Sequence, residues 1–457
     1  MYQRFFPLTI LVVSCPLLGL IFGGAALHAE NWPQWRGPRL TGVSSETQVP
    51  TQWSATDNVA WRLPLPGPAG ATPVVWGDRI YLTTAADDQL QLWCVSTAGE
   101  KIWQRQLDSN GKQTFRNDEG NLASPSPCTD GRHVWALVGT GRLACFDRDG
   151  QNVWTVDLPQ RYGELQIQFG YASTPVLDGQ RLYLQMIHGD GDPQTREAVV
   201  VCLDAATGQE VWKQPRPSDA HDECEHSYAS PTIYRDAQRS FLLTHGADYV
   251  VAHALQDGHE LWRCGGFNPP GNYKPTLRLI ASPAVGDGLI VVPTAKGGPV
   301  LGLRPGGQGD VTESPEFVAW KYPDSTPDVP SPLVHDGLVY LCRENGNLLC
   351  LDAQTGKKVY QKRTVRDRHR ASPVWADGKL YLTSRSGVVT VVRAGRKFEI
   401  LAQNDVEEDI AASPVISGGT LYLRTFQSLI AIRDQDFSVA PNTPFGATGQ
   451  VDTRLTQ

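Results

Sequence analysis

The 457-residue sequence lacks the short motifs that would assign it to a catalytic class. It has no GxSxG nucleophile motif, no phosphate-binding loop, no HExxH zinc motif and no Cys-x-x-Cys-His haem-attachment motif. It also has no run of basic residues, and its formal net charge is −7. A chain of this charge is a poor candidate for binding nucleic acid or an anionic membrane surface.

Long helices are also missing from the pattern. The chain has only 2 Met, against 44 Gly, 33 Pro and 13 Trp, a composition that is typical of many short strands and turns. No stretch beyond the amino terminus keeps the apolar period of a helix over several turns. These observations predict an all-β fold.

Residues 1–29 have the layout of a secretory signal peptide. Arg4 is followed by an apolar run and then by small residues before Glu30, so cleavage is expected after Ala29. An uncleaved membrane anchor is the alternative that the sequence leaves open. Because no second apolar run reaches membrane length, we expect an exported protein of the periplasm, envelope or medium, with no integral membrane segment after cleavage.

Two short elements recur along the chain. The first is a Ser or Thr followed by Pro, an apolar pair, a Gly/Asp turn and an apolar triplet, and it occurs eight times, with prolines 41 to 56 residues apart. The second is represented by "CLDAATGQEVW" at residues 202–212. This period and these turns predict four strands per unit and an eight-bladed β-propeller of four-stranded antiparallel blades.

Aromatic residues in the fourth strand of each unit show how the ring closes. They are Trp61, Trp103, Trp154, Trp212, Trp262, Trp320, Tyr360 and Phe398. The eighth repeat ends at residues 429–433 without such a strand, whereas Trp61 precedes the first repeat. We therefore predict that residues 59–64 complete the last blade. The predicted order is a signal peptide (1–29), an N-terminal extension (30–58), the propeller (59–433) and a C-terminal tail (434–457).

The second element resembles the pyrroloquinoline-quinone-like (PQQ-like) repeat, AxDxxTGxxxW, which is known as the tryptophan docking motif. The resemblance covers residues 59–433, and "NWPQWRGPRLTGVS" at 31–44 is similar to the leader of a group of exported bacterial proteins with such repeats. The superfamily includes quinoprotein alcohol dehydrogenases and the propeller lipoprotein of the outer-membrane protein assembly machine. The resemblance implies that the repeated Trp residues, Trp212 among them, pack against the neighbouring blade.

Quinoproteins of this fold typically have an adjacent Cys-Cys disulfide over the cofactor, a calcium or lanthanide site and a catalytic aspartate. This sequence has no adjacent cysteine pair, and none of its residues matches those ligands or that aspartate. We therefore predict no catalytic residue and no cofactor. The leading hypothesis is an exported, non-catalytic, monomeric scaffold that binds an envelope protein, a peptide or a glycan. The alternative is a PQQ-dependent oxidoreductase with an atypical site.

One polar loop contains residue types that can bind a metal ion, and two cysteines are placed where a disulfide could form. His221, Glu223 and His226 are of ligand types that suit zinc, but their spacing matches no fixed site, so we predict a solvated loop there. Of the eight cysteines that follow the signal peptide, only Cys224 and Cys264 lie in loop-like sequence. The sequence is compatible both with a disulfide between these two and with two free thiols.

The topology of a propeller brings two sets of loops to one face. These are the connections from an outer strand to the next inner strand and those between second and third strands, and binding residues concentrate on such loops. The predicted partner-binding residues are Tyr171, His188, His226, Tyr228, Lys296, Arg343, Arg370 and Arg385. Aromatic rings beside guanidinium groups suit a planar, sugar-like or carboxylate-bearing ligand. The alternative is that these residues pair only with one another.

Overall fold

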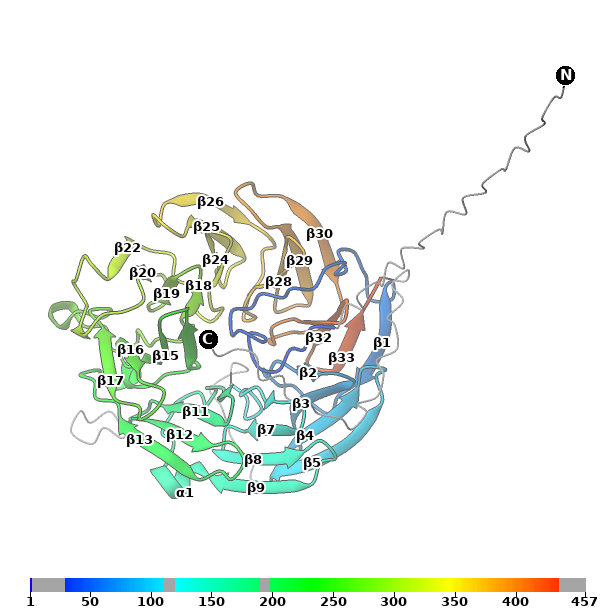
Figure 1. Ribbon diagram of the computed structural model, residues 1–457, viewed down its shortest axis with the longest axis horizontal. Helices are drawn as coiled ribbons and strands as arrows, with labels where there is room; N and C mark the ends of the chain where they lie inside the picture. The colour runs from blue at the N-terminus through cyan, green and yellow to red at the C-terminus, as the bar shows by residue number, and fades with distance from the viewer. Residues whose placement is uncertain (2–28, 110–119, 190–197, 435–457) are drawn as a thin grey trace.

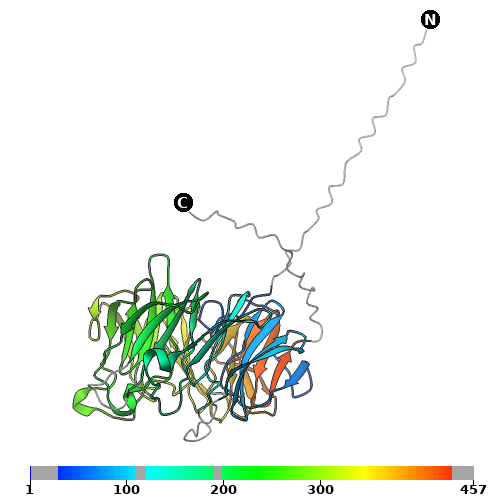
Figure 2. The same ribbon diagram turned by 90° about the horizontal axis from the view of Figure 1, so that it is seen from below.

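The computed structural model describes residue 1 and residues 29–109, 120–189 and 198–434. Eight β-sheets surround a central axis, and the side view shows that they form a flat disc (Figures 1 and 2). The chain is thus an eight-bladed, all-β propeller, as the repeats predict. Nearly all of the predicted signal peptide and C-terminal tail lies outside the described residues.

Each blade has four antiparallel strands, which follow one another outward from the axis in chain order except for the outer strand of the eighth blade. The inner strands are β2 (Val74–Trp76), β6 (Cys128–Thr129), β10 (Val176–Asp178), β14 (Thr232–Arg235), β18 (Ala284–Gly286), β23 (Leu333–His335), β27 (Val374–Ala376) and β31 (Val415–Ser417). The second strands are β3 (Arg79–Ala86), β7 (His133–Leu137), β11 (Arg181–Met186), β15 (Ser240–Gly246), β19 (Leu289–Pro293), β24 (Leu338–Cys342), β28 (Lys379–Thr383) and β32 (Thr420–Arg424).

The third strands are β4 (Gln89–Ser96), β8 (Arg142–Asp147), β12 (Val199–Asp204), β16 (Tyr249–His253), β20 (Val300–Leu303), β25 (Asn347–Asp352), β29 (Val388–Arg393) and β33 (Ser428–Ile432). The outer strands are β5 (Lys101–Asp108), β9 (Asn152–Asp157), β13 (Glu210–Pro215), β17 (Glu260–Cys264), β22 (Val318–Tyr322), β26 (Lys358–Arg363), β30 (Ile400–Asp405) and β1 (Val59–Pro64). Short elements outside this plan are β21 (Gly309–Asp310), helix α1 (Leu158–Tyr162) and the 3₁₀ turns η1 (Asp222–Glu225) and η2 (Pro270–Asn272).

The ring closes through the eighth blade, in which β1 from the amino-terminal side pairs with β33. The pairing is antiparallel and extends from Val59 opposite Ile432 to Pro64 opposite Ser428. Just beyond it, the backbone N–H of Leu65 donates to the carbonyl of Gln427 at 2.7 Å. This confirms the predicted latch, which removes the open sheet edge that β33 would otherwise present.

Neighbouring blades are joined by the repeated tryptophans. The Trp154 indole N–H donates to the carbonyl of Ala205 in the next blade at 3.0 Å. The ring packs on Gly208, whose φ is +69°, and a Cβ at Gly208 would come within 2.7 Å of it. The same indole-to-carbonyl bond links the next blade in four other cases: Trp61, Trp103, Trp212 and Trp320. The repeat is therefore scaffold, and its Thr-Gly turn is the surface on which the preceding tryptophan packs.

Two blades depart from this arrangement. In blade 7, Ala402 stands opposite Val391, in the register position that holds Trp or Tyr elsewhere. The assignment of Phe398 to an outer strand is therefore wrong. Phe398 precedes β30 and packs against Tyr360, with ring centroids 5.6 Å apart. At blade 5 the connection between third and outer strands is long, and part of it, β21, pairs in parallel with β17 of blade 4.

The cysteines are structural. All eight in the described residues are buried free thiols, so Cys224 and Cys264 do not form the disulfide that the sequence left open. The Cys224 Sγ lies 3.3 Å from the carbonyl of Lys274, and burial raises the pKa of Cys264 to about 12. A buried thiol of raised pKa behaves as a small apolar side chain. Among the described residues, no helix has the length and apolarity needed to cross a membrane.

Candidate functional site: a channel closed at one end

The N-terminal segment, residues 30–49, crosses one end of the central channel. Its backbone bonds to the ends of inner strands on several blades: Trp32 pairs with Val75, Pro33 accepts from Thr129, and Ser44 donates to Trp375. These ends lie opposite the Ser/Thr-Pro start of each inner strand, where the chain enters the blade. The segment, dark blue near the centre of Figure 1, therefore closes the channel on the face opposite the predicted binding loops.

A buried arginine fixes this segment in place. Arg36 is 5% exposed, and its guanidinium donates to the carbonyls of Pro332 at 2.7 Å and Pro373 at 2.8 Å. A third bond reaches Thr41 within the segment, at 3.1 Å. Burial lowers the pKa of Arg36 to about 9, yet three carbonyl acceptors compensate the lost hydration. Arg36 thus ties the closing segment to blades 6 and 7.

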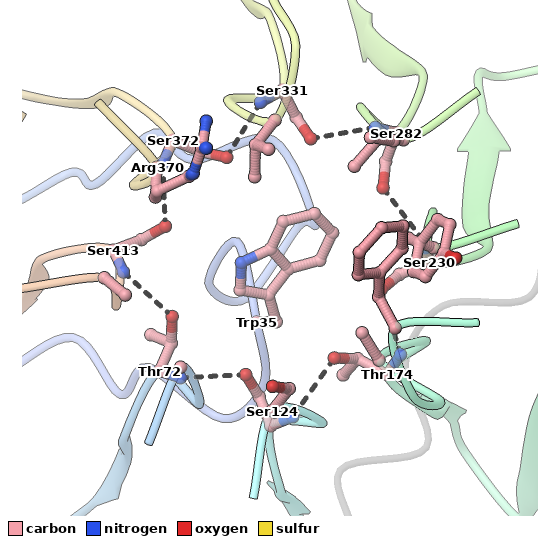
Figure 3. Close-up of a pocket in the computed structure, with 18 of the residues that line it drawn as sticks. Trp35, Thr72, Ser124, Thr174, Ser230, Ser282, Ser331, Arg370, Ser372 and Ser413 are labelled. Atoms are coloured by element: carbon pink, nitrogen blue, oxygen red, sulfur yellow. Dashed lines mark hydrogen bonds between the residues drawn. The ribbon is translucent and has the colours of Figure 1, made fainter. Parts of the chain in front are cut away.

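The repeated Ser or Thr residues form a closed circle of hydrogen bonds around the channel. Each backbone N–H donates to the hydroxyl of the corresponding residue in the next blade, and Ser413 donates to Thr72 at 3.2 Å to close the circle. The eight residues are Thr72, Ser126, Thr174, Ser230, Ser282, Ser331, Ser372 and Ser413. We call this set the hydroxyl ring. Trp35 of the closing segment lies at its centre (Figure 3).

Above Trp35, the channel is a cavity of about 420 Å³. Its wall is formed by the hydroxyl ring and by the residues two positions before each ring member: Gly70, Ser124, Ala172, Tyr228, Ile280, Val329, Arg370 and Ala411. Alternate residues of an extended chain point to the same side, so both positions face the channel. Within the described lining, the larger of these side chains, Tyr228, Ile280, Val329 and Arg370, come from blades 4 to 7.

An aromatic pair with an arginine over it forms part of the mouth. The rings of Phe169 and Tyr228 lie 6.1 Å apart, and the Arg278 guanidinium lies 4.7 Å from the centre of the Phe169 ring. Glu223, from η1, holds Arg278 through an ion pair of 2.6 Å. Burial raises the pKa of Tyr228 to about 12, so this phenol stays neutral at physiological pH.

A charged group lies beside it. Asp328 is 3.4 Å from the ammonium of Lys296 and 3.7 Å from the guanidinium of Arg370, and Lys296 also lies 3.4 Å from Glu344. Of these four residues, Asp328 and Arg370 line the cavity. The mouth therefore combines aromatic faces with alternating charges, which is suited to recognition by stacking and by bidentate hydrogen bonds.

The structure distributes the eight predicted binding residues over this face unevenly. Tyr228 and Arg370 line the cavity. Lys296 is attached to its edge through Asp328. Tyr171 is 2% exposed and donates its hydroxyl hydrogen to the carbonyl of Gln185 at 2.7 Å, since it stands an odd number of positions before Thr174 and points away from the axis.

The remaining four lie outside the cavity lining. His188 is buried, and its burial together with the nearby His226 lowers its pKa to about 4. The His226 Nε2 lies 3.2 Å from the Gly189 carbonyl. Arg385 pairs with Asp409 at 2.7 Å and stacks on Phe426 at 4.0 Å. Arg343, at the corresponding turn of blade 6, bonds through its backbone to Asn347. Their roles in binding stay predictions.

The three weak metal candidates have separate partners. Glu223 pairs with Arg278, and His221 stacks on Tyr273 with ring centroids 3.9 Å apart while its Nδ1 lies 2.6 Å from Asp222. His226 contacts Gly189. Within the part of the chain that the structure describes, no three His, Cys, Asp or Glu side chains are grouped as they would be to hold a metal ion.

A family model described as "Outer membrane protein assembly factor BamB" matches residues 36–138, 139–316 and 314–440, which is most of the chain. The chain belongs to this family. No curated protein matches the sequence. The sequence prediction of a PQQ-like repeat propeller is therefore confirmed at the level of the family.

Solved structures show the same fold. The crystal structure of BamB from Moraxella catarrhalis has a TM-score of 0.58 at 15% identity, over 83% of this chain and 98% of that one. Quinohemoprotein alcohol dehydrogenase from Comamonas testosteroni has a TM-score of 0.63 at 14% identity, over 92% and 82% of the two chains. Quinohemoprotein alcohol dehydrogenase ADHIIG from Pseudomonas putida HK5 has a TM-score of 0.62 at 14% identity, over 93% and 84%. At these identities the likeness establishes the fold alone.

Several residues of this BamB-family channel were not among the predicted site residues. Trp35 lies in the leader sequence, and nothing in a leader indicates that it enters a channel. Phe169, Arg278 and Asp328 lie in loops of the predicted face. Their residue types alone did not mark them as cavity residues among the other residues of these loops. A signal was available in the repeat itself: the position two residues before each Ser/Thr-Pro faces the axis, and it selects Tyr228 and Arg370 while excluding Tyr171.

Proposed function

We propose that the protein is an exported, non-catalytic scaffold of the cell envelope that binds a protein or peptide partner through the loop face, with the channel as its recognition site. The observation that carries this proposal is a channel closed at one end by the N-terminal segment and open on the face that carries the aromatic and charged mouth. A channel of about 420 Å³ has the size of a binding site for a small molecule or a short chain segment.

Family membership supports the same proposal. The family description names an assembly factor of outer membrane proteins, a role in which a propeller contacts other proteins. An exported location agrees with the signal peptide that the sequence predicts at residues 1–29. A glycan remains an alternative ligand for the same mouth, because aromatic rings beside arginine and aspartate also suit sugars.

The second candidate, a PQQ-dependent oxidoreductase, is favoured by the quinohemoprotein alcohol dehydrogenases among the similar structures. The residues of the channel do not fit that cofactor well. The aromatic floor at Trp35 and the two arginines would suit a planar, carboxylate-bearing group. However, Asp328 is the one carboxylate in the described lining, and it already faces Lys296 and Arg370. Among the described residues that line the cavity there is no cysteine. The scaffold is therefore the better supported function.

The channel arginines provide a test of partner binding. We expect Arg278→Ala combined with Arg370→Ala to weaken the binding of the envelope partner by more than about tenfold, or about 1.4 kcal/mol, because both side chains face the cavity. The measurement is the dissociation constant of the partner isolated with the wild-type protein. The matched control is Lys358→Ala with Lys362→Ala, which removes the same charge from exposed positions of β26 on the outer edge.

Partner binding that is unchanged in the Arg278 and Arg370 variant, with its fold intact, would show that the channel is not the recognition site. The sequence also predicts a loss above about tenfold for Arg343→Ala with Arg385→Ala. In the same assay this second pair shows whether the partner contact extends from the channel to the neighbouring turns of blades 6 and 7.

A further inference from the structure

In the part of the chain that the structure describes, the eight hydroxyl protons of the hydroxyl ring have no protein acceptor. Each ring oxygen accepts one backbone N–H, at distances from 2.9 to 3.2 Å. A Ser or Thr hydroxyl also carries one proton to donate. Within the described residues, none of the eight hydroxyls donates to a protein acceptor, although every ring residue is at most 7% exposed. Because all eight line the cavity, their unused protons are available to whatever occupies it.

The rest of the described lining does not satisfy these protons. Trp35 adds an indole N–H from the floor. The arginines of the mouth already have acidic neighbours, Glu223 for Arg278 and Asp328 for Arg370. Each buried donor left without a partner costs roughly 1–3 kcal/mol, so the cavity favours an occupant that brings acceptors to the hydroxyl ring.

The shape of the cavity restricts the occupant further. In the view of Figure 3 the Trp35 ring lies in the middle of the circle of hydroxyl-ring residues, and Phe169 and Tyr228 also line the cavity. A flat group can stack on these rings while its oxygens meet the hydroxyl protons. A neutral sugar is less well matched, because its hydroxyls bring donors as well as acceptors to a ring whose protons need acceptors.

We propose that the channel binds a carboxylate group, carried by a flat or unbranched ligand, through the hydroxyl ring and Arg370. This inference rests on the proposed function, since it names the chemistry that the recognition site selects. The carboxylate belongs either to a small free acid or to the end of a partner's polypeptide chain. Both sources offer the same oxygens to the ring, and the experiment separates them.

The test uses two probes of matched shape, benzoate and benzamide, titrated calorimetrically into the purified mature protein. We expect benzoate to bind about tenfold more tightly than benzamide or better, because only benzoate brings a charged acceptor to the donors. A second pair, the peptide Gly-Gly-Phe with a free carboxyl terminus and the same peptide as its amide, identifies the source. Tighter binding of the peptide acid than of benzoate indicates a chain terminus, and the reverse indicates a free acid.

Variants place the bound probe in the channel. Ser331→Ala with Ser372→Ala is expected to lose most benzoate binding, whereas Ser331→Thr with Ser372→Thr retains it, because Thr72 and Thr174 already serve in the ring. If the alanine pair fails to fold, Arg370→Gln and Trp35→Phe test the same site from the mouth and from the floor. Arg370→Gln should weaken benzoate several-fold while leaving benzamide nearly unchanged, whereas Trp35→Phe should weaken both probes, because both stack on that ring.

Equal affinity for benzoate and benzamide, or no binding of either up to about 10 mM, would overturn the carboxylate proposal. Benzoate binding that survives all of these variants would place the anion elsewhere and would overturn it as well. The proposed function fails on a different readout, the affinity for the envelope partner. If binding of the envelope partner depends on Arg278 and Arg370 but benzoate does not bind, the channel is still the recognition site and only the carboxylate proposal fails.

Discussion

Deleting residues 30–64 should lower the thermal midpoint of unfolding by more than about 15 °C, well beyond the loss expected for a local change. The deletion removes β1, so β33 becomes an exposed edge and blade 8 loses its outer strand. It also removes Arg36, which ties blades 6 and 7 to the segment that closes the channel. The measurement is a melting curve followed by circular dichroism or calorimetry.

A shorter deletion separates the two contributions. Removing residues 30–49 takes away the floor of the channel but leaves β1 in place. We expect this variant to retain the ring with a smaller fall in its melting temperature. If the protein without residues 30–64 melts within a few degrees of the full chain, the closure through β1 does not stabilise the ring.

Trp154→Ala should reduce the free energy of unfolding by roughly 3–5 kcal/mol, as for other large buried rings. Trp154 is 9% exposed, its indole bonds to Ala205, and its ring packs on Gly208 of the next blade. Trp212→Ala, at the equivalent place on Gly258, should cost a similar amount. Both values come from denaturant unfolding monitored by fluorescence.

The matched control for the tryptophan substitution is the preceding residue, Val153, which is 45% exposed on the outer surface. Val153→Ala should change the free energy of unfolding by less than about 0.5 kcal/mol. If Trp154→Ala instead abolishes ligand binding without loss of stability, the docking motif has a functional role that its packing does not explain.

The fold was predictable because its information is local and repeated. A Ser/Thr-Pro start recurs eight times, most copies add a Gly turn and an aromatic outer strand, and the unpaired Trp61 strand indicates where the ring closes. The prediction of an aromatic outer strand failed in blade 7, where the repeat pattern is not kept. Phe398 has the right residue type, but the register places Ala402 opposite Val391, and a one-residue pattern cannot resolve that choice.

The candidate site was less predictable because it is made by residues from many blades. Trp35 reaches the channel only because Arg36 and Trp32 fasten the leader across the far end, and contacts such as Arg36 to Pro373 span most of the chain. The topology of a propeller was enough to predict the face that carries the site. To choose the residues on that face, one also has to apply the alternation of side chains in extended backbone before each Ser/Thr-Pro. Tyr171 illustrates the difference, since it is in the right loop and faces the wrong way.

The most direct test of the central claim is photo-cross-linking from inside the channel in cells that express the protein. A photoreactive phenylalanine analogue is placed at Tyr228, which lines the channel mouth, and in a matched strain at Ile102, which is 42% exposed on the outer edge of blade 1. We expect a discrete cross-linked partner from position 228 and none from position 102. A partner that cross-links from position 102 but not from 228, or from neither, would contradict the assignment of the channel as the recognition site.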